Sequence, residues 1–87
     1  MRSYNKTTWE VLIVLMMVKQ AELAKKREEK GLTRHKLSLL AGLSNNAVFR
    51  METKLYRVSS LRAKAVADAL GCDVADLFYP FTDRKAI

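Results

Sequence analysis

The sequence predicts an all-α protein that forms one small domain of five helices. Its 87 residues, 49% of them hydrophobic, can bury one core but are too few for a second domain. Glycine and proline are scarce, with 3 Gly and 1 Pro, and each stands where a predicted helix ends. Small polar residues that cap helices precede the apolar segments of helical spacing.

The first helix is predicted to run from about Thr8 to Lys30, just before Gly31. Thr7 and Glu10 have the three-residue spacing of a capping box ahead of the apolar run 11–18. A strand is the alternative for 11–18, because this run contains three valines and an isoleucine. The leucines, the methionines and the cap favour the helix.

The next two predicted helices are short and close together. Thr33 caps a helix over 34–41 that Gly42 ends, and Ser44 caps a helix over 45–53. Such a tight joint makes the two helices cross steeply and share one small core. The residues whose spacing turns them toward that core are Leu37, Leu40, Leu43, Val48 and Met51.

Two further helices complete the prediction. Ser59 caps a helix that reaches Leu70 and ends at Gly71. Asp73 and Asp76 open a short last helix over 74–79, which Pro80 stops. The predicted organisation is an N-terminal extension over 1–18, a main domain over 19–80 and a tail over 81–87.

The chain is strongly basic. Lys and Arg outnumber Asp and Glu by 16 to 9, a net charge of +7, which favours a polyanionic partner such as nucleic acid or anionic lipid. One Cys and one His supply neither an internal disulfide nor a zinc site. There is no nucleophile with a base and no phosphate-binding Gly loop. We therefore expect a cytoplasmic protein that is not an enzyme and has no cofactor, metal or evident small-molecule ligand.

The N-terminus has the outline of a secretory signal, with a basic start, an apolar run and small residues near Ala24. Glu10 and Lys19, however, leave only the eight apolar residues of 11–18, whereas a bilayer span needs about 20. We therefore expect neither a cleaved signal nor a membrane-spanning helix.

A motif occupies residues 34–51. Ser38 is the small fifth residue of this motif, Gly42 the ninth-position turn glycine, and Val48 and Met51 the apolar fifteenth and eighteenth residues. With "REEKGLT" before it and "ALGCDVADLF" after it, the chain resembles the Xre/Cro-type, phage-repressor-like helix-turn-helix proteins over roughly 23–78. The resemblance implies a five-helix lambda-repressor-like domain, here with an extended apolar N-terminal helix.

The resemblance also implies binding to double-stranded DNA, with the 45–53 helix in the major groove. Asn can hold adenine, Arg can hold guanine, and an apolar ring can lie against a thymine methyl group. Asn is a poor helix former, so two Asn residues at the start of a helix suggest that their amides contact bases. The alternative is that the amides support the cap and the ring is packed in the core. The predicted base-contacting residues are Asn45, Asn46, Phe49 and Arg50.

Other matched positions imply contacts to the DNA backbone. Positive charge in the first turn of the 34–41 helix opposes the helix dipole unless a phosphate binds there. The alternative is an ordinary solvated basic face. The predicted backbone contacts are Arg34, Lys36, Ser44, Lys54, Tyr56 and Arg57. Arg27 and Glu52 match a family ion pair that would orient the reading helix; the alternative is two exposed charges of little effect.

The family pattern is not followed everywhere. Lys54 stands where a glycine is usual after the reading helix, which puts the turn geometry in doubt, and Lys26 stands where a leucine is frequent, which puts the docking of the first helix in doubt.

The N-terminal apolar run lies outside the family frame. As a helix, it would expose apolar side chains on every side, and a domain of this size can cover only one side. We therefore predict a contact with a second chain, with a homodimer as the default. A deep intramolecular core is the alternative. The contact residues would be Trp9, Val11, Leu12, Ile13, Val14, Leu15, Met16, Met17 and Val18.

These observations favour a dimeric transcriptional repressor. One alternative is an antitoxin-like or accessory protein whose N-terminal helix binds a different protein. Another is a basic peripheral membrane protein anchored through 11–18.

Overall fold

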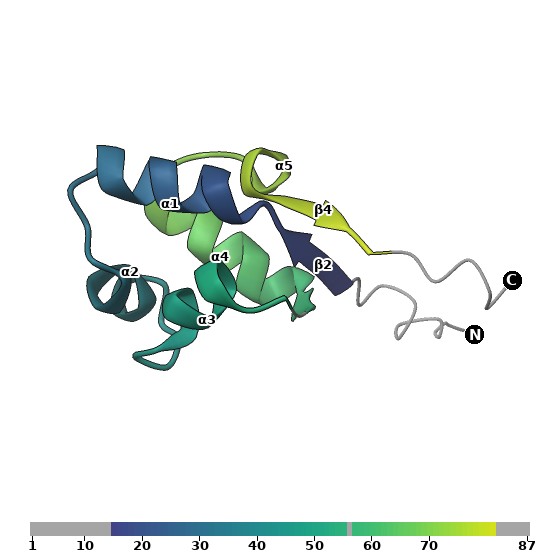
Figure 1. Ribbon diagram of the computed structural model, residues 1–87, viewed down its shortest axis with the longest axis horizontal. Coiled ribbons are helices and arrows are strands. Elements are labelled where there is room, and N and C mark those ends of the chain that lie inside the picture. The colour runs from purple at the N-terminus through teal and green to yellow at the C-terminus, as the bar shows by residue number, and fades with distance from the viewer. Residues whose placement is uncertain (1–14, 56, 82–87) are drawn as a thin grey trace, which may run out of the picture.

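The computed structural model describes residues 15–55 and 57–81, and it shows a helical body with a small sheet at one end (Figure 1). In Figure 1, α2 and α3 lie at the left of the body, and β2 and β4 project from its right side. The helices are α1 (Gln20–Glu29), α2 (Arg34–Leu40), α3 (Ala47–Thr53), α4 (Ser60–Leu70) and α5 (Val74–Leu77). The strands are β2 (Leu15–Val18), β3 (Val58–Ser59) and β4 (Phe78–Pro80). The prediction of an all-α chain was therefore wrong, although the fold is mostly helical.

The sheet is antiparallel, with β2 in the middle and the strand order β3-β2-β4. Along β2, Met16 and Val18 are buried, whereas Leu15 is exposed and Met17 is half-buried. This alternation is that of a strand with one face on the core. The predicted helix was therefore wrong over 15–18, and the strand alternative holds there. Its partners lie about 40 and 60 residues later in the chain, beyond the reach of local pattern reasoning. Residues 8–14 of that predicted helix lie outside the described part of the chain.

The change from strand to helix occurs at Lys19, and α1 begins at Gln20 rather than at Thr8. The Lys19 backbone N–H donates to the carbonyl of Leu77 at 2.8 Å, and its Nζ donates to the carbonyl of Ala75, also at 2.8 Å. These bonds hold the start of α1 against α5. Lys26, whose presence put the docking of this helix in doubt, is partly exposed. It forms an ion pair with Glu29 of the same helix at 3.6 Å.

The predicted caps of three helices are confirmed. The Thr33 hydroxyl accepts from the Lys36 N–H at 3.0 Å, and the Ser59 hydroxyl accepts from the Arg62 N–H at 3.2 Å. Asp73 and Asp76 form the capping box that opens α5. That helix ends at Leu77, however, so the prediction of helix over 78–79 was wrong. Those two residues pair with β2 as part of β4 instead.

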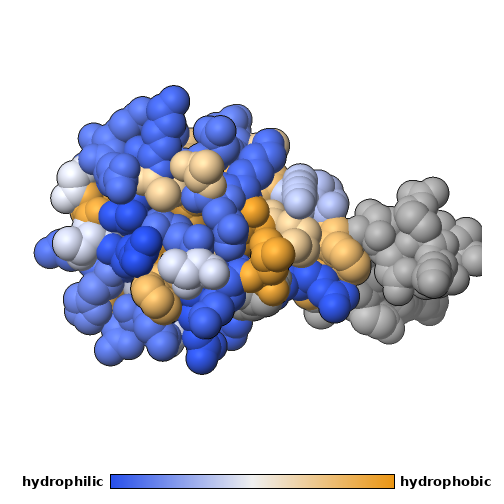
Figure 2. Space-filling model, in the orientation of Figure 1, coloured by the Kyte–Doolittle hydropathy of each residue, from blue (hydrophilic) through white to orange (hydrophobic). Residues whose placement is uncertain are grey.

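One core joins the helical body to the inner face of the sheet. Its buried hydrophobic residues are Met16, Val18, Leu23, Leu37, Val48, Met51, Val58, Ala63, Val66, Ala67, Leu70, Leu77 and Phe78. Leu43 packs against this core, but Leu40, which was predicted to do so, is 57% exposed. Successive helical residues are about 100° apart, so an inner face centred on Leu37, Ser38 and Ala41 turns Leu40 to solvent. In Figure 2 hydrophilic residues cover most of the body, and a hydrophobic patch lies where it meets the sheet.

Candidate nucleic-acid interface

The joint between α2 and α3 is held by Ser38, which is completely buried. Its hydroxyl accepts from the Val48 backbone N–H at 3.0 Å and donates to the Arg34 carbonyl at 2.9 Å. Gly42 takes a φ of +74° in the turn, a left-handed conformation that other residues adopt only with strain. From the sequence, Ser38 was predicted only to be the small fifth residue of the motif. In the structure it also satisfies a buried donor at the start of α3.

Arg27 and Glu52 meet beneath this joint. Arg27 Nε donates to Glu52 Oε2 at 2.6 Å, and Arg27 Nη2 donates to Glu52 Oε1 at 3.0 Å, a bidentate contact. The Glu52 side chain is only 2% exposed, and Arg27 is also buried. The hydrogen bond to Glu52 raises the pKa of Arg27 above its ordinary value, against the opposing effect of burial. Two exposed, weakly interacting charges therefore do not describe this contact.

Arg34 is a second partner of the same carboxylate. Its Nε donates to Glu52 Oε1 at 2.8 Å, and its Cζ lies 5.3 Å from the centroid of the Phe49 ring. The carboxylate of α3 thus offsets part of the positive charge in the first turn of α2. The sequence did not indicate this contact, because the two residues are 18 positions apart and match no family pair.

The four predicted base-contacting side chains lie in the turn before α3 and on α3 itself, and all of them are exposed: Asn45, Asn46, Phe49 and Arg50. Phe49 is 44% exposed, so it is not part of the core that Val48 and Met51 enter from the opposite face of α3. Asn46 stands at the N-cap position, but its side chain makes no cap hydrogen bond. The alternative in which the amides serve the cap therefore has no support from Asn46.

Two local predictions at this helix were wrong. α3 begins at Ala47 rather than at Asn45, and Ser44 does not cap it through its hydroxyl. The Ala47 N–H bonds to the backbone carbonyl of Ser44 at 3.0 Å, and the Ser44 hydroxyl lies 3.4 Å from the Asn46 side-chain oxygen. The residues before Ala47 form a turn, and the next N–H group, that of Val48, donates to the Ser38 hydroxyl.

Gln20 fixes the other end of α3. Its Nε2 donates to the carbonyls of Met51 and Lys54, at 3.1 and 2.9 Å, so the first residue of α1 covers acceptors that the end of α3 leaves unpaired. Nothing in the local sequence singles out this glutamine, since its partners come more than 30 residues later.

Comparison with known families agrees with this geometry. Residues 23–77, well over half of the chain, match the family model described as helix-turn-helix, which is of the Xre/Cro type. The chain belongs to this family. It is a DNA-binding regulator in the general sense that the family defines. No curated protein matches the sequence.

Three of the predicted backbone-contacting residues of this helix-turn-helix protein are exposed basic side chains. Lys36 is in the first turn of α2, Lys54 follows the last residue of α3, and Arg57 lies ahead of β3; all three are exposed. Lys54 has φ −119° and ψ 144°, an extended conformation that requires no glycine, which removes the doubt about the turn. Arg57 lies over the Phe81 ring at 4.5 Å from its centroid. Tyr56 lies outside the described residues.

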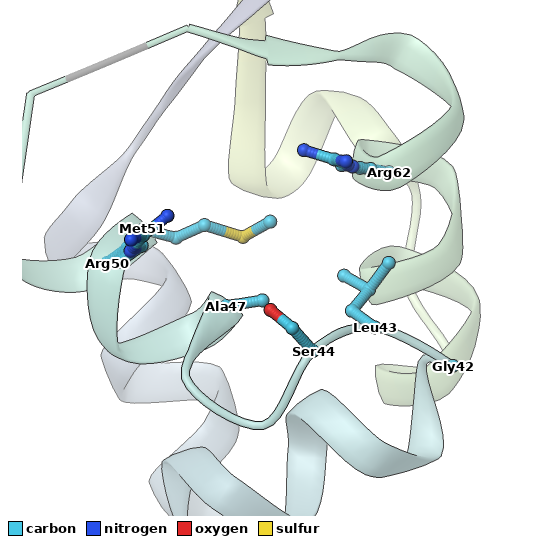
Figure 3. Close-up of a pocket in the computed structure, with 7 residues that line it drawn as sticks. All are labelled: Gly42, Leu43, Ser44, Ala47, Arg50, Met51 and Arg62. Carbon is cyan, nitrogen blue, oxygen red and sulfur yellow. The ribbon is translucent and has the colours of Figure 1, made fainter.

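A pocket of about 310 Å³ opens between α3, the turn that precedes it and the start of α4 (Figure 3). Figure 3 shows Met51 and Arg62 pointing toward its centre from opposite sides, with Ser44 and Ala47 along one edge. It is lined by Gly42, Leu43, Ser44, Ala47, Arg50, Met51 and Arg62. Sequence reasoning missed Arg62, although it is a basic residue in the first turn of a helix, the same signal that drew attention to Arg34.

No helix in residues 15–55 and 57–81 combines the length and the apolar character that crossing a bilayer requires.

Proposed function

We propose that this protein is a repressor that binds an operator in double-stranded DNA as a homodimer, with the start of α3 in the major groove. One observation carries the proposal: Asn45 and Asn46 in the turn before α3, and Phe49 and Arg50 on α3 itself, are all exposed. Beneath them, Val48 and Met51 are fully buried, so α3 is firmly seated while its outer face stays accessible.

The chemistry of the exposed side chains suits base edges. An Asn amide can donate to adenine N7 and accept from adenine N6, and an Arg fork can donate to guanine O6 and N7. The Phe49 ring offers an apolar surface for a thymine methyl group. Each good bidentate contact discriminates against a wrong base by about 1–3 kcal/mol.

The surrounding cations suit the DNA backbone, where contacts set affinity and register but carry no sequence information. The proposed residues are Lys36, Ser44, Lys54, Tyr56 and Arg57, to which the pocket adds Arg62. Arg34 has a different place in the proposal, because its Nε is already committed to Glu52.

A variant series tests the DNA-binding proposal on a duplex selected from a random pool. Asn45→Ala, Asn46→Ala and Arg50→Ala are expected to reduce discrimination between the selected duplex and its single-base variants, because they remove base contacts. Lys36→Ala, Lys54→Ala and Arg57→Ala are expected to weaken binding to every duplex and to lower the slope of log K against log salt by about 1 each. Fluorescence anisotropy over a salt series measures both quantities.

The control is Lys25→Ala, which removes the same charge from an exposed position in the middle of α1. It should leave the discrimination unchanged and the salt slope close to that of the parent protein. Equal losses on all duplexes for all six site variants would contradict the proposed division, and an absence of duplex binding at low salt would contradict the function itself.

The proposed dimer contact is apolar. In β2 and β4, Leu15 and Tyr79 are exposed, and Phe81, whose N–H donates to the Leu15 carbonyl at 2.8 Å, is exposed as well. In the sequence, Leu15 follows the other predicted contact residues, Trp9 and 11–14, which lie outside the described residues. Met16 and Val18, predicted as contact residues, are instead buried in the protein's own core. A twofold dimer would match half-sites about 34–36 Å apart.

Sedimentation equilibrium tests the dimer. The full chain is expected to sediment as a dimer, and Leu15→Lys with Phe81→Lys is expected to shift it toward monomer without loss of helical circular dichroism. A monomeric parent protein would refute the homodimer. Aggregation of the lone chain would point to the antitoxin-like alternative, in which a different protein covers this surface.

A further inference from the structure

Three side chains link α2 to the exposed face of α3. Glu52 is buried near the end of α3, Arg34 comes from the first turn of α2, and Phe49 lies three residues before Glu52 on α3. Arg34 touches both of the others: its Nε donates to Glu52 Oε1 at 2.8 Å, and its Cζ lies 5.3 Å from the Phe49 ring centroid. Arg34 therefore connects a buried carboxylate to one of the proposed base-reading side chains.

The carboxylate end of this connection is rigid. Glu52 is held from the other side by Arg27, at 2.6 and 3.0 Å, and Arg27 Nη1 in turn donates to the Leu32 carbonyl at 2.8 Å. A planar guanidinium bonded through Nε to a carboxylate so held has little freedom to turn, since the charge-assisted bond constrains its plane. The position of the Arg34 guanidinium is thus set from inside the protein.

The ring end of the connection is exposed. A phenylalanine on the surface of a helix, without neighbours, moves among its staggered rotamers within nanoseconds. A cation placed over one side of the ring is attracted by the ring quadrupole and favours the rotamer in which the two meet. Phe49 keeps 44% of its surface open in this arrangement, which leaves part of the ring available to a ligand.

We infer that Arg34 is a positioning residue that, anchored by Glu52, holds the Phe49 ring ready to receive the 5-methyl group of a pyrimidine in the major groove. This inference rests on the proposed function and deepens it, because it names the residue that positions the ring and extends the methyl group read to a second base. Two bases carry that group in duplex DNA, thymine and 5-methylcytosine, and both place it in the major groove. The role differs from that of a phosphate clamp, since the Arg34 Nε is already bonded to the Glu52 carboxylate.

The test removes one methyl group at a time. In the selected duplex, each thymine is replaced singly by deoxyuridine, and the dissociation constant is measured by anisotropy. The parent protein is expected to lose about fourfold in affinity at one position of each half-site, the effect of one methyl group no longer buried. Phe49→Ala should bind the thymine and deoxyuridine duplexes equally. If no position is sensitive in the parent protein, the inference is overturned.

Two variants of Arg34 then separate positioning from charge. Arg34→Lys keeps the charge but lacks the planar fork, and Arg34→Met loses the charge. Both are expected to reduce the fourfold methyl effect to less than twofold while leaving the salt slope within the error of the parent value. Lys36→Ala is the matched control from the same helical turn, and it should lower the salt slope and keep the methyl effect.

The opposite pattern would identify a phosphate clamp. In that case Arg34→Met would weaken all duplexes equally and lower the salt slope by about 1, Arg34→Lys would resemble the parent protein, and the methyl effect would survive in both. That result overturns the inference and leaves the proposed function intact. A parent protein without any preference among duplexes would instead refute the proposed function.

A measurement without DNA provides a second readout. The ring protons of Phe49 should change in NMR chemical shift in Arg34→Met and hardly at all in Lys36→Ala, and the parent Arg34 Nε–H should exchange slowly with solvent because Glu52 accepts it. An unchanged Phe49 spectrum in Arg34→Met would overturn the inference even if both variants bind DNA. At the methyl-sensitive position, a duplex with cytosine in place of thymine is compared with the same duplex carrying 5-methylcytosine there. Tighter binding of the methylated duplex shows that the site reads the methyl group on either base, and equal binding shows that it reads the group only on thymine.

Discussion

Different kinds of interaction stabilise the two ends of this molecule. At the α2–α3 end, buried polar side chains make the decisive contacts: Ser38 with Val48, and Glu52 with two arginines. At the sheet end, the inner surface is apolar, with Val18 and Phe78 facing the core from paired positions of β2 and β4. The same short chain thus uses directional bonds at one end and non-directional packing at the other.

The difference follows from what each end has to leave exposed. α2 and α3 have seven residues each, and the outer face of α3 carries exposed side chains, Phe49 among them, instead of packing against the protein. Little apolar surface then remains to define the angle between the two helices, so hydrogen bonds of fixed length and direction define it instead. A buried ion pair is weak evidence for added stability. Its clearest effect here is to fix how α2 and α3 are placed relative to each other. The sheet end has no such demand on its inner face.

The largest expected effect is at the sheet end. Phe78 is 1% exposed, and Phe78→Ala is expected to lower the free energy of unfolding by about 3–5 kcal/mol through lost burial and the cavity that remains. Phe78→Leu should cost only about 1 kcal/mol, since apolar packing tolerates a change of shape. Urea unfolding followed by circular dichroism measures both. Similar losses for the two variants would mean that this end is as geometrically demanding as the other.

A nearly isosteric change is expected to have a large effect at the α2–α3 end. Glu52→Gln keeps the volume but removes the buried counter-charge of Arg27 and leaves it only the exposed Glu28 carboxylate at 3.7 Å, at an expected cost of about 2–3 kcal/mol. The matched control is Glu29→Gln, which alters an exposed pair with Lys26 and should change stability by less than about 1 kcal/mol. The same urea titrations apply. Equal small effects would show that the Glu52 contacts contribute little to this end.

The smallest of the three effects concerns one hydroxyl group. Ser38→Ala removes the acceptor of the buried Val48 N–H and is expected to cost about 1–2 kcal/mol. Thr53→Ala removes a hydroxyl that donates to the Phe49 carbonyl at 2.7 Å at an exposed site, and should stay within about 0.5 kcal/mol. Amide hydrogen exchange at Val48 should accelerate in the first variant and not in the second. If exchange at Val48 does not accelerate in Ser38→Ala, the Ser38 hydroxyl does not stabilise the start of α3.

Local chemistry was sufficient for much of the helical body. Thr33, Ser59 and the Asp73–Asp76 pair are capping residues because their oxygen atoms reach N–H groups only three positions away. A glycine in the turn between α2 and α3 is likewise a local requirement, and the spacing of Ser38, Val48 and Met51 around it carries the resemblance to the family. The exposure of the α3 side chains also followed from helical spacing.

The sequence by itself determined the starts of α2, α4 and α5 and the face of α3 that turns outward, because both depend on neighbours a few residues apart. The tertiary structure alone decided that residues 15–18 form a strand, since that conformation is stabilised by pairing with β3 and β4 from the other half of the chain. It also decided that Gln20 covers the end of α3 and that Arg34 joins Glu52 to Phe49. These contacts join residues that only the packing of α1, α2 and α3 brings within hydrogen-bond distance, and no local pattern encodes that distance.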